Sequence, residues 1–86
     1  MTPVFAVYTK DNCQQCVATT RLLARKEVHY SEVPIEERPG VLAYAQERGW
    51  TSAPVVMVHD VTGQLVAAWS GFRPDKIKAL LQRRAA

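Results

Sequence analysis

The sequence predicts an α/β fold in which a four-stranded mixed sheet is flanked by three helices, in the order β-α-β-α-β-β-α. Short runs rich in β-branched and aromatic residues alternate with stretches whose apolar residues recur at helical spacing. The last two β-rich runs are separated by turn-forming residues, which is typical of a hairpin. The length of 86 residues, of which 48% are hydrophobic, suits one compact domain spanning residues 1–86.

The first half of the chain predicts a strand, a helix and a second strand. Residues 3–8, which read PVFAVY, suit a buried strand. Residues 14–26 contain no Gly or Pro, and Ala18 and Leu22 lie four positions apart on the narrow apolar stripe of a helix. Residues 27–33 alternate less regularly, but their valine and tyrosine content predicts another strand.

The second half predicts a helix, a hairpin and a last helix. Residues 39–48 begin with proline, which suits a first helical position, and Gly49 follows them as a C-terminal cap. Residues 55–59 and 64–69 are the paired strands, with Asp and Gly between them as breakers. Pro74 opens the last helix, whose apolar face consists of isoleucine and leucine.

The order of the elements constrains the sheet. We expect strands that are joined through a helix to run parallel, with a right-handed crossover. The two hairpin strands should join the same sheet antiparallel to each other. The helices then cover the faces of the sheet and bury their apolar stripes against it.

Charge and hydropathy exclude several classes of protein. Eleven Lys and Arg against eight Asp and Glu leave a net charge of +3, which is too small and too scattered to indicate nucleic-acid binding. No apolar run approaches the ~18–20 residues that span a bilayer, so we expect no membrane insertion. The N-terminus has neither a basic start nor an apolar signal core, so we expect a cytoplasmic location.

The two cysteines, Cys13 and Cys16, are the most informative residues. A structural disulfide between them would close a very small loop and restrict the unfolded chain little. The pair therefore indicates chemistry, either redox exchange or metal binding. A structural zinc site normally needs four ligands, and the two histidines, His29 and His59, lie far along the chain. A metal shared between two chains remains an alternative.

The predicted position of the pair favours redox exchange. Cys13 lies where a strand passes into a helix, so the free N–H groups and the positive end of the helix dipole would stabilise its thiolate. Cys16 lies one turn into the helix, within disulfide reach and less exposed. It could therefore resolve a mixed disulfide formed on Cys13. Lys10 could add its ammonium group to the stabilisation of the thiolate.

The dipeptide Ala53-Pro54 marks the entrance to a strand, because proline has no N–H to donate to a sheet. Taken alone, most such peptide bonds are trans. If this bond were cis, the loop could leave the Ala53 backbone exposed beside the cysteines. An extended substrate chain could then pair with it like an added strand.

Four short motifs stand out along the chain: residues 8–10 (YTK), 13–19 (CQQCVAT), 51–55 (TSAPV) and 69–74 (WSGFRP). The C-x-x-C motif alone would be a weak signal, but the order and spacing of all four resemble those of the NrdH-redoxins, small glutaredoxin-like proteins of bacteria and their phages. The resemblance covers nearly the whole chain, residues 4–82.

The resemblance implies a thioredoxin fold and a monomeric dithiol carrier whose Cys13–Cys16 disulfide is redox-active. It implies electron transfer to the large subunit of a class Ib ribonucleotide reductase. The electrons would come from NADPH through thioredoxin reductase, with no cofactor bound to the chain. Cys13 would attack, Cys16 would resolve, and a cis Ala53–Pro54 bond would face them. The residues implied at the substrate or partner surface are Lys10, Gln14, Gln15, Ser52, Ala53, Pro54, Trp69, Gly71, Phe72 and Arg73.

The chain departs from ordinary glutaredoxins, which carry Pro-Tyr between the cysteines and a Gly-Gly pair that holds glutathione. Here Gln14 and Gln15 lie between the cysteines, Gly71 is followed by Phe72, and Asp75 is the one nearby carboxylate. These departures disfavour tight glutathione binding. Two alternatives remain: a glutathione-dependent glutaredoxin, with Lys10 holding the tripeptide, and a metal-binding interaction module that uses Cys13 and Cys16.

Overall fold

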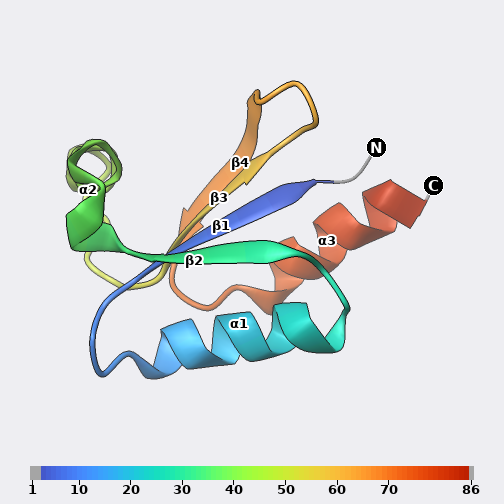
Figure 1. Ribbon diagram of the computed structural model, residues 1–86, viewed down its shortest axis with the longest axis horizontal. Coiled ribbons are helices and arrows are strands. Elements are labelled where there is room, and N and C mark those ends of the chain that lie inside the picture. Colours follow the sequence, from blue (N-terminus) through green and yellow to red (C-terminus); the bar gives the residue numbers. More distant parts are fainter. Residues whose placement is uncertain (1–2, 86) are drawn as a thin grey trace.

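The computed structural model describes residues 3–85, and the side chains of residues 3–82. Within these residues it contains a four-stranded mixed sheet and three α-helices (Figure 1), which confirms the predicted fold class. The elements are β1 (Val4–Thr9), α1 (Gln14–Arg25), β2 (Tyr30–Pro34), a short 3-10 helix η1 (Ile35–Glu37), α2 (Pro39–Glu47), β3 (Val55–His59), β4 (Leu65–Ser70) and α3 (Pro74–Ala85).

The strand order in the sheet is β2-β1-β3-β4. Strand β2 runs parallel to β1, as expected for strands joined through a helix. Strand β3 runs antiparallel to β1 although α2 precedes it, so the parallel expectation is wrong for this connection. Figure 1 shows the reason: α1 runs back to the end of the sheet where β1 begins, whereas α2 stays at the end where β2 finishes. The chain therefore enters β3 from that end and runs back.

Two hydrophobic clusters lie on opposite faces of the sheet, and each is covered by helices. Helices α1 and α3 pack on one face, around a cluster that includes Phe5, Leu23 and Ile77. Helix α2 covers the other face, where Ile35 and Ala45 are buried. Within the described residues, no helix combines the length and the apolar character needed to cross a membrane.

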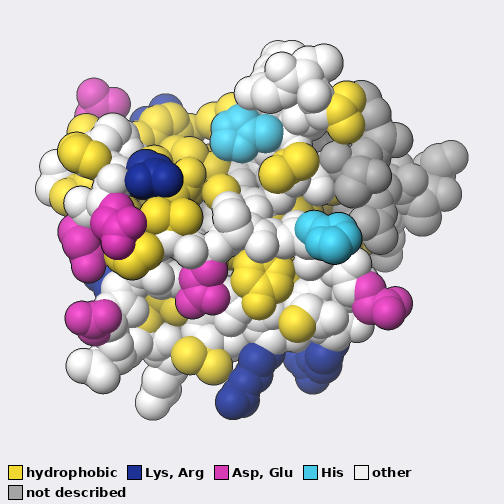
Figure 2. Space-filling model, in the orientation of Figure 1, with side chains coloured by type: hydrophobic (Ala, Val, Ile, Leu, Met, Phe, Trp, Pro, Cys, Tyr) yellow, Lys and Arg dark blue, Asp and Glu magenta, His cyan; other side chains and the backbone are white. Residues whose placement is uncertain are grey.

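Charge is unevenly distributed over these elements. Figure 2 shows Lys and Arg side chains projecting beyond α1 at the lower edge of the view, whereas most of the visible Asp and Glu side chains lie toward α2. The sequence of α1 contains two arginines and two glutamines but no Asp or Glu.

Strand β2 begins three residues later than the predicted start at residue 27. Glu27 has a φ of 57°, and its N–H donates to the carbonyl of Ala24, while the N–H of Val28 donates to the carbonyl of Leu23. This pair of bonds is a Schellman motif, which satisfies the last carbonyls of α1. Because these residues terminate α1, strand β2 begins only after them.

The buried face of α1 is rotated slightly from the predicted apolar stripe. The buried residues are Cys16, Thr19, Leu22 and Leu23, while Ala18 is only half-buried. The buried Thr19 is compatible with the core because its hydroxyl donates to the carbonyl of Gln15, at 2.8 Å. Burial of this face leaves Ala18 half-buried and the neighbouring Arg21 exposed.

The strand register brings three loops to one end of the sheet. Tyr8, near the end of β1, pairs with Val55 at the start of β3. Val55 in turn pairs with Ser70 at the end of β4. The loop after β1, the loop before β3 and the turn after β4 therefore meet at this end, which we call the cysteine end.

Candidate functional site

The cysteine pair lies at the first turn of α1, and the two residues are joined by a disulfide with Cα atoms 5.2 Å apart. Cys13 is the N-cap residue and is half-buried. Cys16 is inside the helix and only 4% exposed. Cys13 is therefore the more accessible of the two cysteines, and the expected lower exposure of Cys16 is confirmed.

Two hydrogen bonds fix Cys13 at the helix terminus. The N–H of Cys16 donates to Cys13 Sγ at 3.0 Å, and the N–H of Val17 donates to the carbonyl of Cys13 at 3.2 Å. The side chain of Cys13 thus occupies the position that Ser or Asp takes in a usual N-cap. A thiolate at this position would accept the same N–H and lie at the positive end of the helix dipole.

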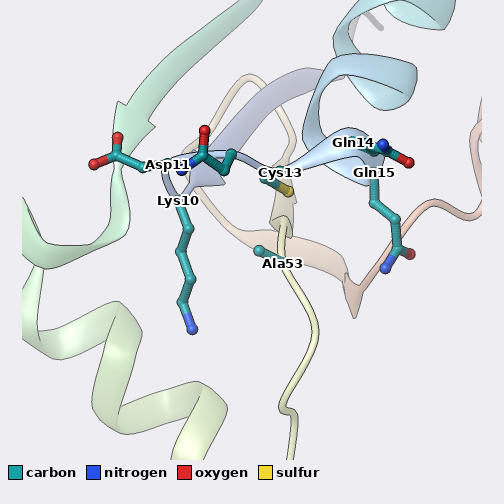
Figure 3. A pocket seen from close by; sticks show the side chains of 7 residues that line it. Lys10, Asp11, Cys13, Gln14, Gln15 and Ala53 are labelled. Atoms are coloured by element: carbon teal, nitrogen blue, oxygen red, sulfur yellow. The ribbon is translucent and has the colours of Figure 1, made fainter.

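An open pocket of about 410 Å³ lies beside Cys13. It is formed by residues 10–12, the first turn of α1 and Ala53 (Figure 3). In this view Cys13 lies above Ala53, whereas the Lys10 side chain extends away from the sulfur. Lys10 therefore lines the pocket but does not contact the cysteine in this conformation.

The Ala53–Pro54 peptide bond is cis, as the family resemblance implies. Pro54 is fully buried, and Ala53 lines the pocket opposite Cys13. Among the described residues, the N–H and C=O of Ala53 have no hydrogen-bond partner. An extended chain bound across the cysteine could therefore pair with Ala53 as an added strand.

The turn after β4 is attached to the cis-proline loop. Ser70 Oγ donates to the carbonyl of Ser52 at 2.6 Å, and the N–H of Gly71 donates to the carbonyl of Pro54 at 2.8 Å. These bonds hold the two loops together behind Ala53.

Gln15 attaches the same turn to the cysteine helix. Its Oε1 accepts the N–H of Phe72 at 3.0 Å. Gly71 has a φ of +84°, and a Cβ built on it would lie 2.9 Å from that oxygen, so a side chain at residue 71 would push against the Gln15 amide. The structure thus assigns Gln15 an internal contact that no local sequence pattern indicates.

Trp69 is only 3% exposed and belongs to the core around Phe5 and Ile77. Its side chain therefore packs inside the protein, and its expected place on the partner surface is wrong. Phe72 is half-buried beside the same core, and Arg73 is exposed.

Arg73 is bound to the first turn of α3. Its Nε and Nη2 donate to the two carboxylate oxygens of Asp75 at 3.1 and 2.8 Å. This hydrogen-bonded pair lowers the pKa of Asp75 from 3.8 to about 2 and raises that of Arg73. The charge of Arg73 is thus largely balanced within its own turn.

The remaining expected partner residues lie around the same end. Gln14 is exposed and points away from Ala53 in Figure 3, and Ser52 is exposed in the loop that leads to the cis proline. Among the described residues there is no group of three or more His, Cys, Asp or Glu side chains that could hold a metal ion.

Comparison with known proteins agrees with this geometry. Residues 5–62 match the glutaredoxin family. The glutaredoxin-like protein NrdH of Lactococcus lactis subsp. cremoris is 35% identical over 74 residues, which cover 86% of this chain and 94% of that protein. The glutaredoxin-like protein NrdH of Escherichia coli K12 is 31% identical over 74 residues, covering 86% of this chain and 84% of that protein.

Solved structures give the same result. The glutaredoxin-like NrdH-redoxin from Escherichia coli superposes with a TM-score of 0.72 and 30% identity, covering 90% of this chain and 93% of that one. The thioredoxin of Fasciola hepatica superposes with a TM-score of 0.66 at 18% identity, covering 95% of this chain and 80% of that one, which supports the thioredoxin fold alone. With two close cysteines at the head of α1, this chain is a thiol–disulfide oxidoreductase of the glutaredoxin family, and within that family it belongs to the NrdH-redoxins.

Proposed function

We propose that this chain carries electrons from thioredoxin reductase, driven by NADPH, to the large subunit of a class Ib ribonucleotide reductase in the cytoplasm. The observation that carries the proposal is the similarity to NrdH proteins over 86% of the chain. The Escherichia coli NrdH-redoxin is described as having a thioredoxin-like activity profile. In this proposal the chain acts as a monomer and binds no cofactor of its own.

The reaction follows from the positions of the two sulfurs. The Cys13 thiolate attacks one sulfur of the partner disulfide, which forms a mixed disulfide and releases one partner thiolate. Cys16 Sγ then attacks Cys13 Sγ, which forms the Cys13–Cys16 bond and releases the second partner thiolate. Counted from the neutral dithiol, the chain gives up two electrons and two protons: one proton when Cys13 ionises and one when Cys16 is deprotonated for its attack. The reductase returns them by the same exchange in the opposite direction.

The cis-proline loop would position the partner. Pairing of an extended partner segment with the free N–H and C=O of Ala53 would bring its disulfide against Cys13. This contact uses backbone groups and therefore does not depend on the partner's side chains.

The test compares two ways of reducing the protein. Oxidised protein is mixed with NADPH and a bacterial thioredoxin reductase, or with NADPH, glutathione and glutathione reductase, and the loss of NADPH is followed with an excess of peptide disulfide. We expect the thioredoxin reductase route to be faster. A faster glutathione route would favour the glutaredoxin alternative, in which Lys10 binds a glutathione carboxylate in the pocket beside Cys13.

The second arm tests the electron acceptor. A class Ib ribonucleotide reductase is supplied with the pre-reduced protein as its only dithiol, and deoxyribonucleotide formation is measured. We expect turnover with the unmodified protein and none with Cys13→Ser. Absence of turnover with the unmodified protein would contradict this acceptor while leaving the exchange chemistry intact.

A further inference from the structure

The outer surface of α1 forms a groove with the turn after β4. The groove has a volume of about 510 Å³ and is lined by Ala18, Arg21, Ala24, Arg25 and Phe72. We call it the α1–Phe72 groove. Val17, which directly follows Cys16, is 48% exposed at the head of the same helix. Apolar surface therefore extends from the cysteine end along α1.

The groove carries positive charge that no carboxylate within residues 3–82 neutralises. Both arginines are exposed, and α1 contains no acidic residue. The ion pairs within residues 3–82 are Arg48–Glu47 and Arg73–Asp75, so neither Arg21 nor Arg25 has a carboxylate partner there. Figure 2 shows Lys and Arg side chains along the lower edge of the view, where α1 lies in Figure 1.

The position of the groove relative to the reacting sulfur is held by Gln15. Its Oε1 accepts the N–H of Phe72, which fixes the far wall of the groove to the first turn of α1. The same turn contains Cys13 and Cys16. One wall of the groove and the disulfide are therefore attached to the same turn of α1.

We propose that the α1–Phe72 groove binds an acidic segment of the protein whose disulfide Cys13 attacks. Carboxylates of that segment pair with Arg21 and Arg25, and an apolar side chain contacts Phe72 and Val17. Guanidinium groups bind carboxylates with two parallel hydrogen bonds, which orients the segment as well as attracting it. A protein fits better than a nucleic acid because the reaction requires a disulfide in the bound molecule and the groove wall is apolar.

The experiment uses protein that has been reduced with dithiothreitol and freed of it, so its outcome does not depend on which reductase serves the protein. The substrates are disulfide-linked dimers of a short cysteine peptide that contains one leucine and is flanked by glutamates, glutamines or lysines. Each exchange converts one peptide disulfide into two thiols and the protein dithiol into the Cys13–Cys16 disulfide. Acid quenching, alkylation and mass spectrometry give the rate.

The expected result is a rate about 5–10-fold higher for the glutamate peptide than for the glutamine peptide at low salt, because complementary charges raise association rates. The advantage should disappear at 1 M salt, where the screening length is about 3 Å. The lysine peptide should be slowest.

Two variants and one control locate the effect. Arg21→Gln combined with Arg25→Gln should reduce the glutamate-to-glutamine ratio to about one, and Arg21→Glu with Arg25→Glu should favour the lysine peptide. Arg38→Gln removes an exposed charge beside α2, on the other face of the sheet, and should leave the ratio unchanged. Thermal unfolding confirms that each variant is folded.

Three outcomes would overturn the proposal. The first is an unchanged ratio in the Arg21→Gln/Arg25→Gln protein. The second is an equal fall in the ratio with Arg38→Gln, which would indicate net charge instead of the groove. The third is tight binding of single-stranded poly(U) that this double variant abolishes while the peptide ratio stays the same.

Discussion

The two ends of the sheet are held together in different ways. At the end away from the cysteines, the turn between β3 and β4 is built by one side chain: Asp60 Oδ1 accepts from the N–H groups of Thr62 and Gln64, at 2.9 and 3.1 Å. Every partner in this turn lies within four residues of Asp60.

At the cysteine end, the bonds connect segments that are distant in the sequence. Gln15 accepts from Phe72 across 57 positions, and Ser70 donates to Ser52 across 18. The hairpin turn can form from its own residues, whereas the geometry around Cys13 exists only when three segments are packed together. A substitution at the cysteine end should therefore affect both stability and exchange, and one at the hairpin turn should affect stability alone.

The largest expected effect is on the chemistry, which belongs to one end only. Cys13→Ser should lower the rate of peptide disulfide reduction by about 10³-fold or more, because the attacking thiolate is lost. Cys16→Ser should instead accumulate a mixed disulfide that mass spectrometry detects, because Cys13 can still attack. Thr62→Ala, in the hairpin turn, serves as the control and should keep the full rate. Appreciable turnover by the Cys13→Ser protein would contradict the assignment of the attacking sulfur.

Two glycines sharpen the comparison. Gly71 and Gly63 both have positive φ, at +84° and +89°, but a Cβ at Gly63 would meet nothing within 4 Å. Gly63→Ala should therefore lower the unfolding free energy by only about 1–2 kcal/mol, which is the cost of a Cβ in the left-handed backbone region. Gly71→Ala should cost about 2–4 kcal/mol, since it adds an overpacked contact with Gln15. Urea unfolding measures both, and only Gly71→Ala should slow disulfide exchange.

A double-mutant cycle tests the cause. In a Gln15→Ala background the crowded amide oxygen is absent, so Gly71→Ala should be about 1 kcal/mol less costly than in the unmodified chain. Additive effects of the two substitutions would mean that the Gln15 amide moves aside freely. The two ends would then respond to an added Cβ in the same way.

A smaller effect is expected on lowering the pH, and it can be measured at one carboxylate at each end of the sheet. Asp75 at the cysteine end has its pKa lowered to about 2 by its hydrogen bonds to Arg73, and Asp60 at the hairpin end has its pKa lowered by the Thr62 hydroxyl. A folded-state pKa below the ordinary 3.8 means that the stabilisation is present above that pH and is lost as pH falls toward 2. Carboxyl NMR titration of Arg73→Gln should show the pKa of Asp75 rising toward 3.8 and that of Asp60 unchanged. A shift at both carboxylates would contradict the separation of the two ends.

The smallest effect concerns the far end of α1, which is again held by local bonds. Glu27 has a φ of 57° in the Schellman motif, where glycine is favoured. Glu27→Gly should raise the unfolding free energy by about 0.5–1 kcal/mol, because relief of the left-handed backbone outweighs the extra flexibility of glycine in the unfolded chain. The exchange rate should not change. Destabilisation would show that the Glu27 side chain makes a contribution that its backbone geometry does not reveal.

Local signals predicted much of the fold. Pro39 begins α2, and the helix ends at Gly49, which has a φ of +69°. There the N–H of Gly49 donates to the carbonyl of Gln46, and the N–H of Trp50 donates to the carbonyl of Ala45. Strand β3 has the predicted bounds. These features depend on residues a few positions apart, so their pattern is visible in the chain itself.

Other features depended on packing. The direction of β3 follows from where α2 lies, and the burial of Trp69 follows from the cluster that α1 and α3 form on one face of the sheet. The side chain of Lys10 extends away from the sulfur that its sequence proximity suggested it would contact. None of these outcomes has a signature within a few neighbouring residues.

The sequence by itself determined the order of the elements and the cysteine pair at the start of a helix, because apolar periodicity, caps and the spacing of Cys13 and Cys16 are local properties. Only the tertiary structure decided what surrounds that pair. The strand register and the bonds from Gln15 and Pro54 to the turn after β4 join residues far apart in the chain, and such contacts form only when the segments pack on a common sheet.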